Sequence, residues 1–233
     1  MRRNGLLDEL AERMTQLAAA AEPARPSLVA VDGVDGAGKT RFADELAAAL
    51  RARGAVTFRA SVDGFHHPPD VRYRRGSRSP EGFYLDSFDL SAFRRRLLDP
   101  LRPGGDRRVV RAVYDVTREQ PVTPAVEVVD EAAVVLVDGI FLHRPELVEA
   151  WDLSVFLAVP CEVSVARCAA RDATDPGPDA PTNRRYVEGQ QLYLATCAPE
   201  RRATLVVDNT DLAAPRVVVD RASSSRRTGP PTG

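Results

Sequence analysis

The chain alternates between short apolar runs and longer segments in which apolar side chains recur every three or four residues. The short runs are typical of strands buried in a parallel sheet, and strands are expected at 28–32, 55–60, 134–138, 153–159 and 204–208. The helical spacing predicts helices over 4–21, from the glycine-rich stretch to near Gly54, and over 89–98, 162–172 and 184–197. This order predicts an α/β fold, with a parallel sheet covered by helices on both faces.

Three further segments interrupt the alternation of strands and helices. Residues 63–88 are polar and rich in arginine and proline, and they are too long for an ordinary connection, so we expect a functional or lid-like segment. Residues 108–116 and 122–129 alternate β-branched and polar side chains, which predicts a hairpin. Residues 173–183 form a proline-rich break between two helices.

Composition and charge narrow the class of protein. The chain has 233 residues, 44% of them hydrophobic, and a net charge of −1, so its bulk charge gives no reason to expect nucleic acid or an anionic membrane as a partner. No apolar run reaches the length of a membrane span, and residues 1–27 lack the pattern of a signal peptide. The three cysteines show no C-x-x-C pair, which favours a reducing, cytoplasmic compartment, with Cys161 and Cys168 facing the core.

The chain has 32 basic residues, and 31 of them are arginine; the exception is Lys39, in the segment Gly33–Thr40. This segment fits the phosphate-binding P-loop pattern G-x-x-x-x-G-K-[ST], which requires a strand before it and a helix after it. The glycines let the backbone approach a phosphate, and a lysine is a compact charge on a thin stem. The pattern therefore predicts binding of a nucleotide, ATP, by Gly33, Asp35, Gly36, Ala37, Gly38, Lys39 and Thr40.

Two carboxylates follow predicted strands and suit the chemistry of phosphoryl transfer. Asp138 ends an apolar run, and together with the Thr40 hydroxyl it is expected to hold Mg²⁺. Asp63 follows the second strand, where it could accept the proton of an acceptor hydroxyl. An Asx turn that holds Gly64 is the structural alternative for Asp63.

Arginines near the proline-rich break are candidates for a lid that closes over the phosphates. Arg167 and Arg171 lie four residues apart on one helical face, and Arg184 and Arg185 follow the break. Arginine charge can stabilise the oxygens of a transferred phosphoryl group, although ordinary surface arginines would show the same spacing. We expect His143 at a helix start or on the surface, and the run of Arg72, Arg74, Arg75 and Arg78 to be a solvated, mobile face.

From about residue 28 to residue 210 the chain resembles the uridine kinase group of P-loop kinases, which includes pantothenate kinase, phosphoribulokinase and nicotinamide riboside kinases. The residues that carry the resemblance are the P-loop, the Val62–Phe65 segment, Ser87–Asp89, Val113–Asp115, Asp138–Ile140 and the Arg171–Asp172 helix end. The resemblance implies a P-loop NTPase fold with a small hairpin insert and a lid. It implies a kinase domain over 26–220, with an acceptor-binding insert at 63–130 and a lid at 172–186. Outside the resemblance, the helical spacing predicts an N-terminal helix within 1–25, and residues 221–233, rich in Ser, Arg, Pro and Gly, are expected to be a disordered tail.

The resemblance also implies roles for individual residues. Asp63, Lys39 and Arg171 would be catalytic, and Arg167 would join the nucleotide site. Asp89, Tyr114, Ile140 and Arg185 would line the acceptor site, with either Gln190 or Gln191. Three positions depart from the family: Asp138 stands in place of a glutamate, Cys168 in place of a lid arginine, and no histidine follows Tyr114 to read a pyrimidine.

The predicted activity is ATP- and Mg²⁺-dependent phosphorylation of a primary hydroxyl of a small metabolite. The 5′-hydroxyl of a nucleoside, uridine or cytidine, is the first expectation. A pantothenate- or nicotinamide riboside-type kinase, and a nucleotide-binding regulator with no small-molecule acceptor, are the alternatives. The sequence leaves the oligomeric state open, a homo-oligomer included.

Overall fold

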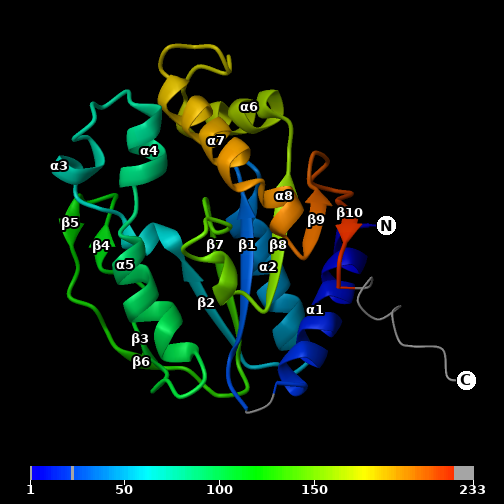
Figure 1. Ribbon diagram of the computed structural model, residues 1–233. Helices are drawn as coiled ribbons and strands as arrows, with labels where there is room; N and C mark the ends of the chain where they lie inside the picture. The colour runs from blue at the N-terminus through cyan, green and yellow to red at the C-terminus, as the bar shows by residue number, and fades with distance from the viewer. Residues whose placement is uncertain (1, 22–23, 223–233) are drawn as a thin grey trace, which may run out of the picture.

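A six-stranded sheet forms the centre of the molecule, in the order β10-β9-β8-β1-β7-β2 (Figure 1). The structure is a computed structural model that describes residues 2–21 and 24–222. The strands of the sheet are β1 (Ser27–Gly33), β2 (Thr57–Ser61), β7 (Val134–Gly139), β8 (Leu153–Ala158), β9 (Leu205–Asp208) and β10 (Arg216–Asp220). The first five are parallel, and β10 pairs antiparallel with β9 at one edge.

The register of the parallel strands brings the ends of β1, β7 and β2 together. Val31 of β1 and Ser61 of β2 both lie opposite Asp138 of β7. Because these strands are parallel, the segments that follow them meet at one edge of the sheet. In doubly wound sheets this edge is where ligands bind.

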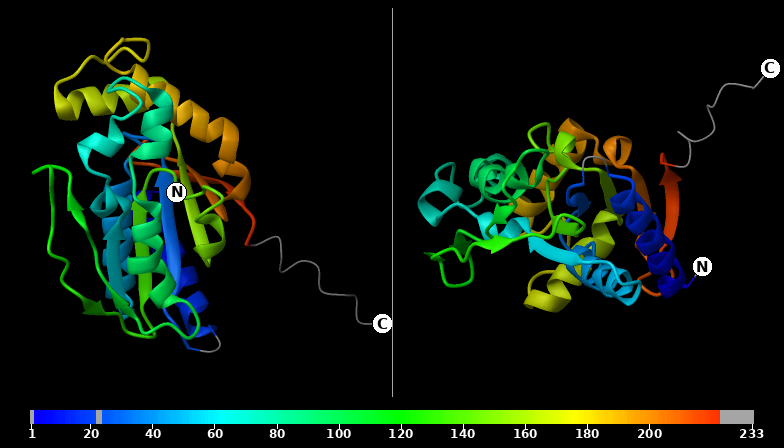
Figure 2. Two further views of the ribbon diagram at one scale, coloured as in Figure 1. Left: turned by 60° about the vertical axis from the view of Figure 1, so that its left-hand side comes forward. Right: turned by 90° about the horizontal axis from the view of Figure 1, so that it is seen from below.

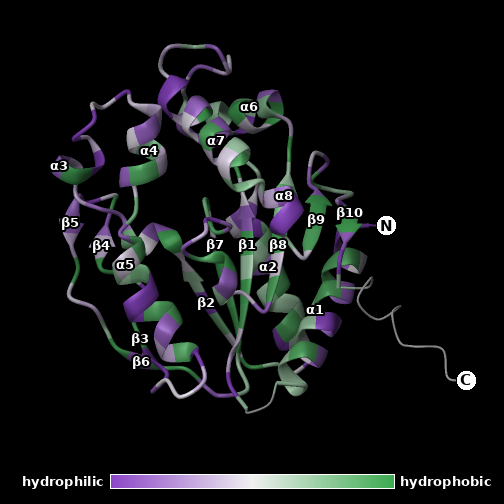
Figure 3. Ribbon diagram, viewed as in Figure 1, coloured by the Kyte–Doolittle hydropathy of each residue, from purple (hydrophilic) through white to green (hydrophobic). Residues whose placement is uncertain are grey.

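Helices cover both faces of the sheet (Figure 2). They are α1 (Arg3–Ala19), α2 (Lys39–Ala52), α3 (Pro69–Arg72), α4 (Pro80–Asp86), α5 (Leu90–Phe93), α6 (Cys161–Asp172), α7 (Arg184–Cys197) and α8 (Pro199–Arg202). Apolar side chains of α1 and α2 pack on one face of the sheet, and those of α4, α5 and α7 pack on the other. The buried strands are correspondingly apolar in Figure 3. The expected α/β fold, a parallel sheet with helices on both faces, is confirmed.

The segment between β2 and β7 forms a lobe beside the sheet. It begins with a 3₁₀ turn, Val62–Phe65, and includes α3, α4 and α5, the π-helical turn Arg94–Leu98 and the 3₁₀ turn Asp99–Leu101. Two short antiparallel ladders follow, β3 (Arg108–Val109) with β6 (Glu127–Val128) and β4 (Tyr114–Asp115) with β5 (Gln120–Pro121). The hairpin expected over 108–129 therefore exists, with strands much shorter than predicted. A last 3₁₀ turn, Val148–Ala150, precedes β8.

Several expectations from the sequence need correction. The edge strand β10 was not expected, because its side chains are largely exposed and give no buried run. Cys161 and Cys168 are half-buried rather than core residues, and Cys197 is the buried thiol.

The tail expected to be disordered lies, from residue 223 on, outside the described residues. Within the described residues, no helix combines the length and the apolar character needed to cross a bilayer.

Gly139, at the end of β7, lets the turn after β2 lie directly across the neighbouring strand. A Cβ atom at this position would lie 2.3 Å from Cγ1 of Val62, well inside contact distance. Val62 is fully buried and directly precedes Asp63. The absence of a side chain at residue 139 therefore determines how closely Asp63 approaches Asp138.

We expect Gly139→Ala to lower the free energy of unfolding by about 1–3 kcal/mol, because the added methyl group overpacks a buried contact. Urea unfolding of the full chain measures the change. Gly177→Ala, in the exposed segment between α6 and α7, is the matched control and should change the stability little. Adding Val62→Ala to Gly139→Ala should restore part of the loss; two losses that simply add would contradict the proposed contact.

Candidate functional site

The loop between β1 and α2 has the geometry of an anion-binding cradle. Gly36 and Gly38 have φ of +75° and +87°, a backbone conformation that favours glycine. A Cβ atom on Gly36 would lie 2.2 Å from the carbonyl oxygen of Ser164, so α6 packs directly on the loop. Gly38 begins α2 without a side-chain cap, which leaves the first N–H groups of the helix available to an anion.

Lys39 folds back over this loop. Its Nζ donates a hydrogen bond to the carbonyl of Val34 at 2.9 Å and lies 3.9 Å from Oδ1 of Asp35. The side chain is only 11% exposed, so the ammonium group stays close to the cradle. This is the position from which a lysine can reach a bound phosphate.

Thr40 and Asp138 meet at the end of β7, as the sequence led us to expect. The Thr40 hydroxyl donates to Oδ2 of Asp138 at 2.7 Å. Arg59, which the sequence analysis did not single out, donates from Nη2 to Oδ1 of the same carboxylate at 2.9 Å. Arg59 comes from an alternating position of β2, where a partly buried arginine gives no sequence signal of its own.

The oxygen atoms of Thr40 and Asp138 fit Mg²⁺, which prefers hard oxygen ligands and keeps several waters. In the described part of the chain, no group of three or more histidine, cysteine or acidic side chains could hold a metal by itself. A magnesium ion at this position would therefore take most of its ligands from phosphates and water.

Asp63 lies in the 3₁₀ turn after β2, on the same side of the sheet as Lys39. The residue is solvent-exposed, but its carboxyl group lies among protein groups. The pKa of this carboxyl is raised, chiefly because the surrounding protein removes water from it; His66 and Lys39 oppose the rise, and Asp138 and Asp35 add to it. The ring Nδ1 of His66 lies 2.9 Å from the Asp63 carbonyl oxygen, and burial lowers the pKa of the imidazole.

A cleft of about 430 Å³ opens between α6 and α7, above the P-loop. Its lining includes Asp35, Cys168, Arg171, Tyr186 and Gln190. Arg171 pairs with the adjacent Asp172 through two hydrogen bonds of 2.7 and 2.8 Å, and this pairing raises the pKa of the guanidinium. The segment between the two helices, at the top of Figure 1, contributes Thr174, Thr182 and Asn183 to the lining.

Two arginines predicted to bind ligands make their hydrogen bonds in this structure to backbone carbonyls. Arg167 donates to the carbonyls of Gly36, Asn209 and Thr210, so it fastens α6 to the P-loop. Arg185 is 6% exposed and donates to the carbonyls of Arg72, Gly76 and Ser79. The sequence cannot distinguish these roles, because a guanidinium suits carbonyls and phosphates equally well.

Gln190, not Gln191, is the glutamine that faces the P-loop. Its Oε1 accepts a hydrogen bond from the backbone N–H of Asp35 at 2.6 Å, and its Nε2 donates to the carbonyl of Tyr186. Gln191 is exposed. Of the two glutamines, Gln190 contacts the loop itself, and a contact of either one with the acceptor stays a prediction.

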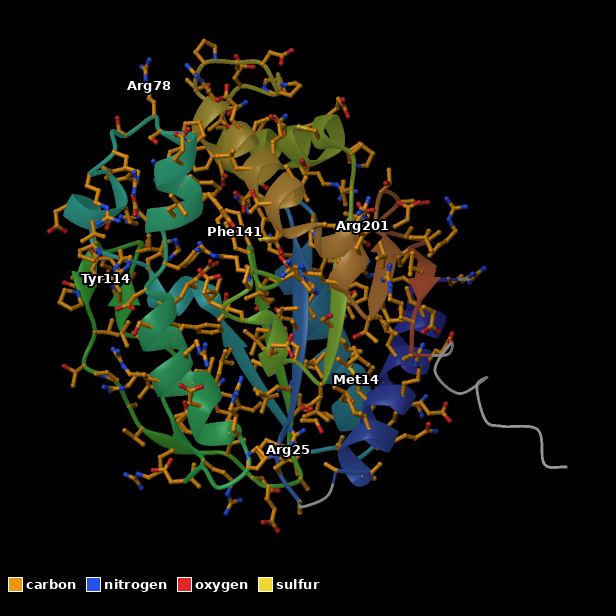
Figure 4. The ribbon with its side chains drawn as sticks, in the orientation of Figure 1. Met14, Arg25, Arg78, Tyr114, Phe141 and Arg201 are labelled. Carbon is orange, nitrogen blue, oxygen red and sulfur yellow. The ribbon has the colours of Figure 1, made fainter. Side chains whose placement is uncertain are left out.

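The remaining acceptor-site candidates lie in or next to the lobe after β2. Asp89 caps α5, with Oδ1 accepting from the backbone N–H of Ala92 at 2.8 Å. Tyr114, labelled at the edge of Figure 4, is 6% exposed and donates to Glu119 at 3.0 Å. Glu119 also pairs with Arg72, and Ile140 is buried in the apolar core. These contacts fix Asp89 and Tyr114 rigidly but leave their assignment to an acceptor as a prediction.

The run of arginines at 72–78 is only partly the solvated face that we expected. Arg74, Arg75 and Arg78 are exposed, whereas Arg72 is 7% exposed. Arg74 and Arg75 also pair with the buried carboxylate of Asp86. Arg78 extends outward at the top left of Figure 4. The local sequence pattern shows no sign of the two ion pairs, because Asp86 lies eleven or twelve residues further along the chain than the arginines.

A buried polar network below the P-loop was missed altogether. Asp32 and His143 are both fully buried, whereas His143 was expected at a helix start or on the surface. Oδ2 of Asp32 accepts hydrogen bonds from the backbone N–H of His143, from its Nδ1 and from the Tyr193 hydroxyl of α7. Oδ1 accepts from the N–H of Gly33, the first residue of the P-loop.

The last member of this network is Ser154. Its hydroxyl oxygen accepts a hydrogen bond from the N–H of Thr204 and lies 2.9 Å from Nε2 of His143. The two ring nitrogens of His143 are therefore held between Asp32 and Ser154. Burial and Asp32 together raise the pKa of Tyr193, so this hydroxyl remains a donor.

Three solved structures of similar fold are described as kinases. The chain is 28% identical to a candidate fructose transport system kinase from Silicibacter, with a TM-score of 0.66, covering 81% of this chain and 94% of that one. It is 22% identical to a candidate uridine kinase from Bacillus stearothermophilus (TM-score 0.63; 85% and 98% covered). It is 12% identical to D-glycerate 3-kinase from Cryptococcus neoformans (TM-score 0.60; 92% and 98% covered).

These likenesses show that the chain has the fold of P-loop kinases. No family model matches the sequence. The three proteins are named for different substrates, so the shared fold leaves the substrate of this chain open.

We expect Tyr193→Phe to lower the free energy of unfolding by about 1–3 kcal/mol, because the change removes one donor from a fully buried carboxylate. The ring should stay in place, since it packs edge-on against Phe141 with centroids 5.0 Å apart. Tyr186→Phe removes an equivalent hydroxyl from the more exposed part of α7 and should leave the unfolding free energy within about 0.5 kcal/mol of the parent. Equal stabilities of the two variants in urea unfolding would show that the hydroxyl of Tyr193 contributes nothing to the free energy of unfolding.

Proposed function

We propose that this chain is a kinase that transfers the γ-phosphoryl group of ATP, in the presence of Mg²⁺, to a primary hydroxyl of a small metabolite. The observation that carries the proposal is the position of Asp63. Its carboxylate lies at the sheet edge that also holds Lys39, Thr40 and Asp138, close enough for Lys39 and Asp138 to shift its pKa. A nucleotide switch needs the cradle and the metal ligands, but it has no use for a base with a raised pKa beside them.

The residues then have distinct tasks. The cradle and Lys39 hold the β- and γ-phosphates, while Thr40 and Asp138 would hold Mg²⁺, which neutralises charge on the phosphates when bound. Asp63 accepts the proton of the acceptor hydroxyl. At the same time the hydroxyl oxygen forms a bond to the γ-phosphorus, and the bond between this phosphorus and the bridging oxygen of the departing ADP breaks. Arg171 could reach the phosphates from the rim of the cleft after it leaves Asp172.

In the described part of the chain, no hydrogen bond from a neighbouring donor occupies the carboxylate of Asp63. Its backbone carbonyl and backbone N–H make the local contacts of the turn, to His66 and Ser61. In the Asx-turn alternative, the carboxylate of Asp63 would accept a hydrogen bond from a backbone N–H of the turn. The hydrogen bonds of the turn use the backbone atoms of Asp63 and leave its carboxylate out. This leaves both carboxylate oxygens for an incoming hydroxyl.

A nucleoside, uridine or cytidine, is our first candidate acceptor, with Asp89 and Tyr114 beside its ribose. A sugar-type acceptor is the second candidate. No histidine that could read a pyrimidine follows Tyr114 in this chain, and in that region Glu119 is held by Arg72 and Tyr114. The structure with the higher identity of those compared is named for fructose.

An acceptor screen tests the proposal directly. With ATP and Mg²⁺, we expect one acceptor among uridine, cytidine, fructose, glycerate, pantothenate and nicotinamide riboside to raise ADP formation at least tenfold over the acceptor-free rate. The phosphorylated product should be identified by mass spectrometry. ATP binding with slow hydrolysis that none of these compounds stimulates would favour a nucleotide-binding regulator instead.

We expect Asp63→Asn to lower kcat about 10²- to 10⁴-fold without weakening ATP binding, because the amide cannot accept the proton. Asp70→Asn, an exposed carboxylate in the same lobe, is the control. In the parent, kcat/KM should fall on the acid side with an apparent pKa above 3.8, since the folded-state pKa of Asp63 is raised and the base must be ionised. Near-normal turnover of Asp63→Asn would remove Asp63 from the mechanism.

The stability of this variant separates loss of the base from loss of the fold. A raised carboxyl pKa means that ionisation of Asp63 disfavours the folded state, increasingly as pH rises through the unfolded and then the folded pKa. Asp63→Asn should therefore be at least as stable as the parent at neutral pH, and the two should converge under acid conditions.

A further inference from the structure

Arg3, at the start of α1, is buried against the far side of the P-loop. Only 7% of the residue is exposed. Its Nη1 donates to Oδ1 of Asn209 at 3.3 Å and to the carbonyl of Leu212 at 3.1 Å, and its Nε pairs with Glu45 of α2. The guanidinium carbon also lies 5.5 Å from the centroid of the Phe42 ring.

Asn209 connects Arg3 to the P-loop. It is fully buried, and its Nδ2 donates to the carbonyl of Ala37 at 2.7 Å. The two ends of the amide are therefore used in opposite directions, with the oxygen towards Arg3 and the nitrogen towards the loop. Because Arg3 can only donate, it fixes which end of the amide faces Ala37.

The orientation of the Ala37 carbonyl matters for anion binding. A trans peptide is planar, with its C=O and N–H pointing in opposite directions. When Asn209 holds the carbonyl of Ala37, the N–H of Gly38 in the same peptide points away from that carbonyl and is free of Asn209. Asn209 is also close, since a Cβ atom on Gly38 would lie 3.1 Å from its Nδ2.

The contacts of Arg3 are a poor arrangement for stability alone. Its Nη2 is buried without a hydrogen-bond partner in the described part of the chain. A buried charge that is incompletely paired is usually no better for stability than an apolar side chain of similar size. This favours a role for Arg3 in the loop to which its contacts lead.

We propose that Arg3 is a positioning residue for nucleotide binding, acting through Asn209 on the peptide between Ala37 and Gly38. The N-terminal helix, for which the sequence suggested no role, thereby completes the phosphate cradle from behind. The inference rests on the nucleotide-binding part of the proposed function and is independent of the acceptor.

The test measures nucleotide affinity of the full chain by calorimetry, with ADP and Mg²⁺ and no acceptor present. We expect Arg3→Gln to raise the Kd about fivefold to tenfold, the scale of one hydrogen bond from a charged donor. Arg2→Gln, at the neighbouring exposed arginine, should leave the Kd unchanged. Arg3→Lys keeps the charge beside Glu45 but loses the planar fork, so it should fold as the parent does and still bind ADP more weakly.

A double variant distinguishes positioning from general stability. Asn209→Asp removes the donor to Ala37 and should weaken ADP binding at least as much as Arg3→Gln. Adding Arg3→Gln to it should then weaken binding no further, because both changes break one chain of contacts. Additive losses, or a lower melting temperature of Arg3→Gln and Arg3→Lys with an unchanged Kd, would overturn the proposal. A parent that binds ADP but phosphorylates no acceptor would refute the kinase activity and leave this inference standing.

Discussion

A carboxylate with no exposure to water lies where β1 becomes the P-loop, and much of the site depends on it. Removing a charge from water is expensive unless hydrogen bonds replace the lost hydration. Asp32 receives four donors from three places: Gly33 of the loop, His143 after β7 and Tyr193 of α7. None of these can move without leaving the charge unsatisfied, so the base of the loop and α7 form one rigid unit. Gln190, one turn before Tyr193, extends the same unit to the crest of the loop.

Rigidity at this point determines which parts can move. Helix α7 is held at two points, by the hydrogen bonds of Gln190 and Tyr193. Helix α6 packs directly on Gly36, and Arg167 joins it to the carbonyl of the same residue. Closure over a bound nucleotide would then fall to the segment between the two helices and to side chains on its rim. Arg171 suits such a part, because within residues 2–21 and 24–222 its ion-pair partner is the adjacent, exposed Asp172. An exposed ion pair is easily exchanged.

The sequence predicted the fold and the centre of the site because both are encoded locally. Apolar runs marked the parallel strands, and the pattern from Gly33 to Thr40 marked the loop, so Thr40 and Asp138 could be paired from strand topology alone. The failures concern contacts between residues far apart in the chain. His143 looks like a surface residue until Asp32 is seen to be its partner, and Arg72 looks solvated until Glu119 is found beside it. Arg59 and Arg3 are of the same kind.

The excess of arginine over lysine now has a structural meaning. Arg59, Arg111, Arg144, Arg167 and Arg185 each donate to at least one backbone carbonyl, often at a point where two elements meet. A guanidinium has five donors in a fixed plane, so one side chain can bridge several carbonyls at once. The wide, flat guanidinium would be unsuitable inside the cradle, because the space there is narrow. The Nζ atom of Lys39 already lies 2.9 Å from the carbonyl oxygen of Val34. The chain thus uses arginine where several carbonyls must be joined, and its single lysine where one compact charge must fit a narrow space.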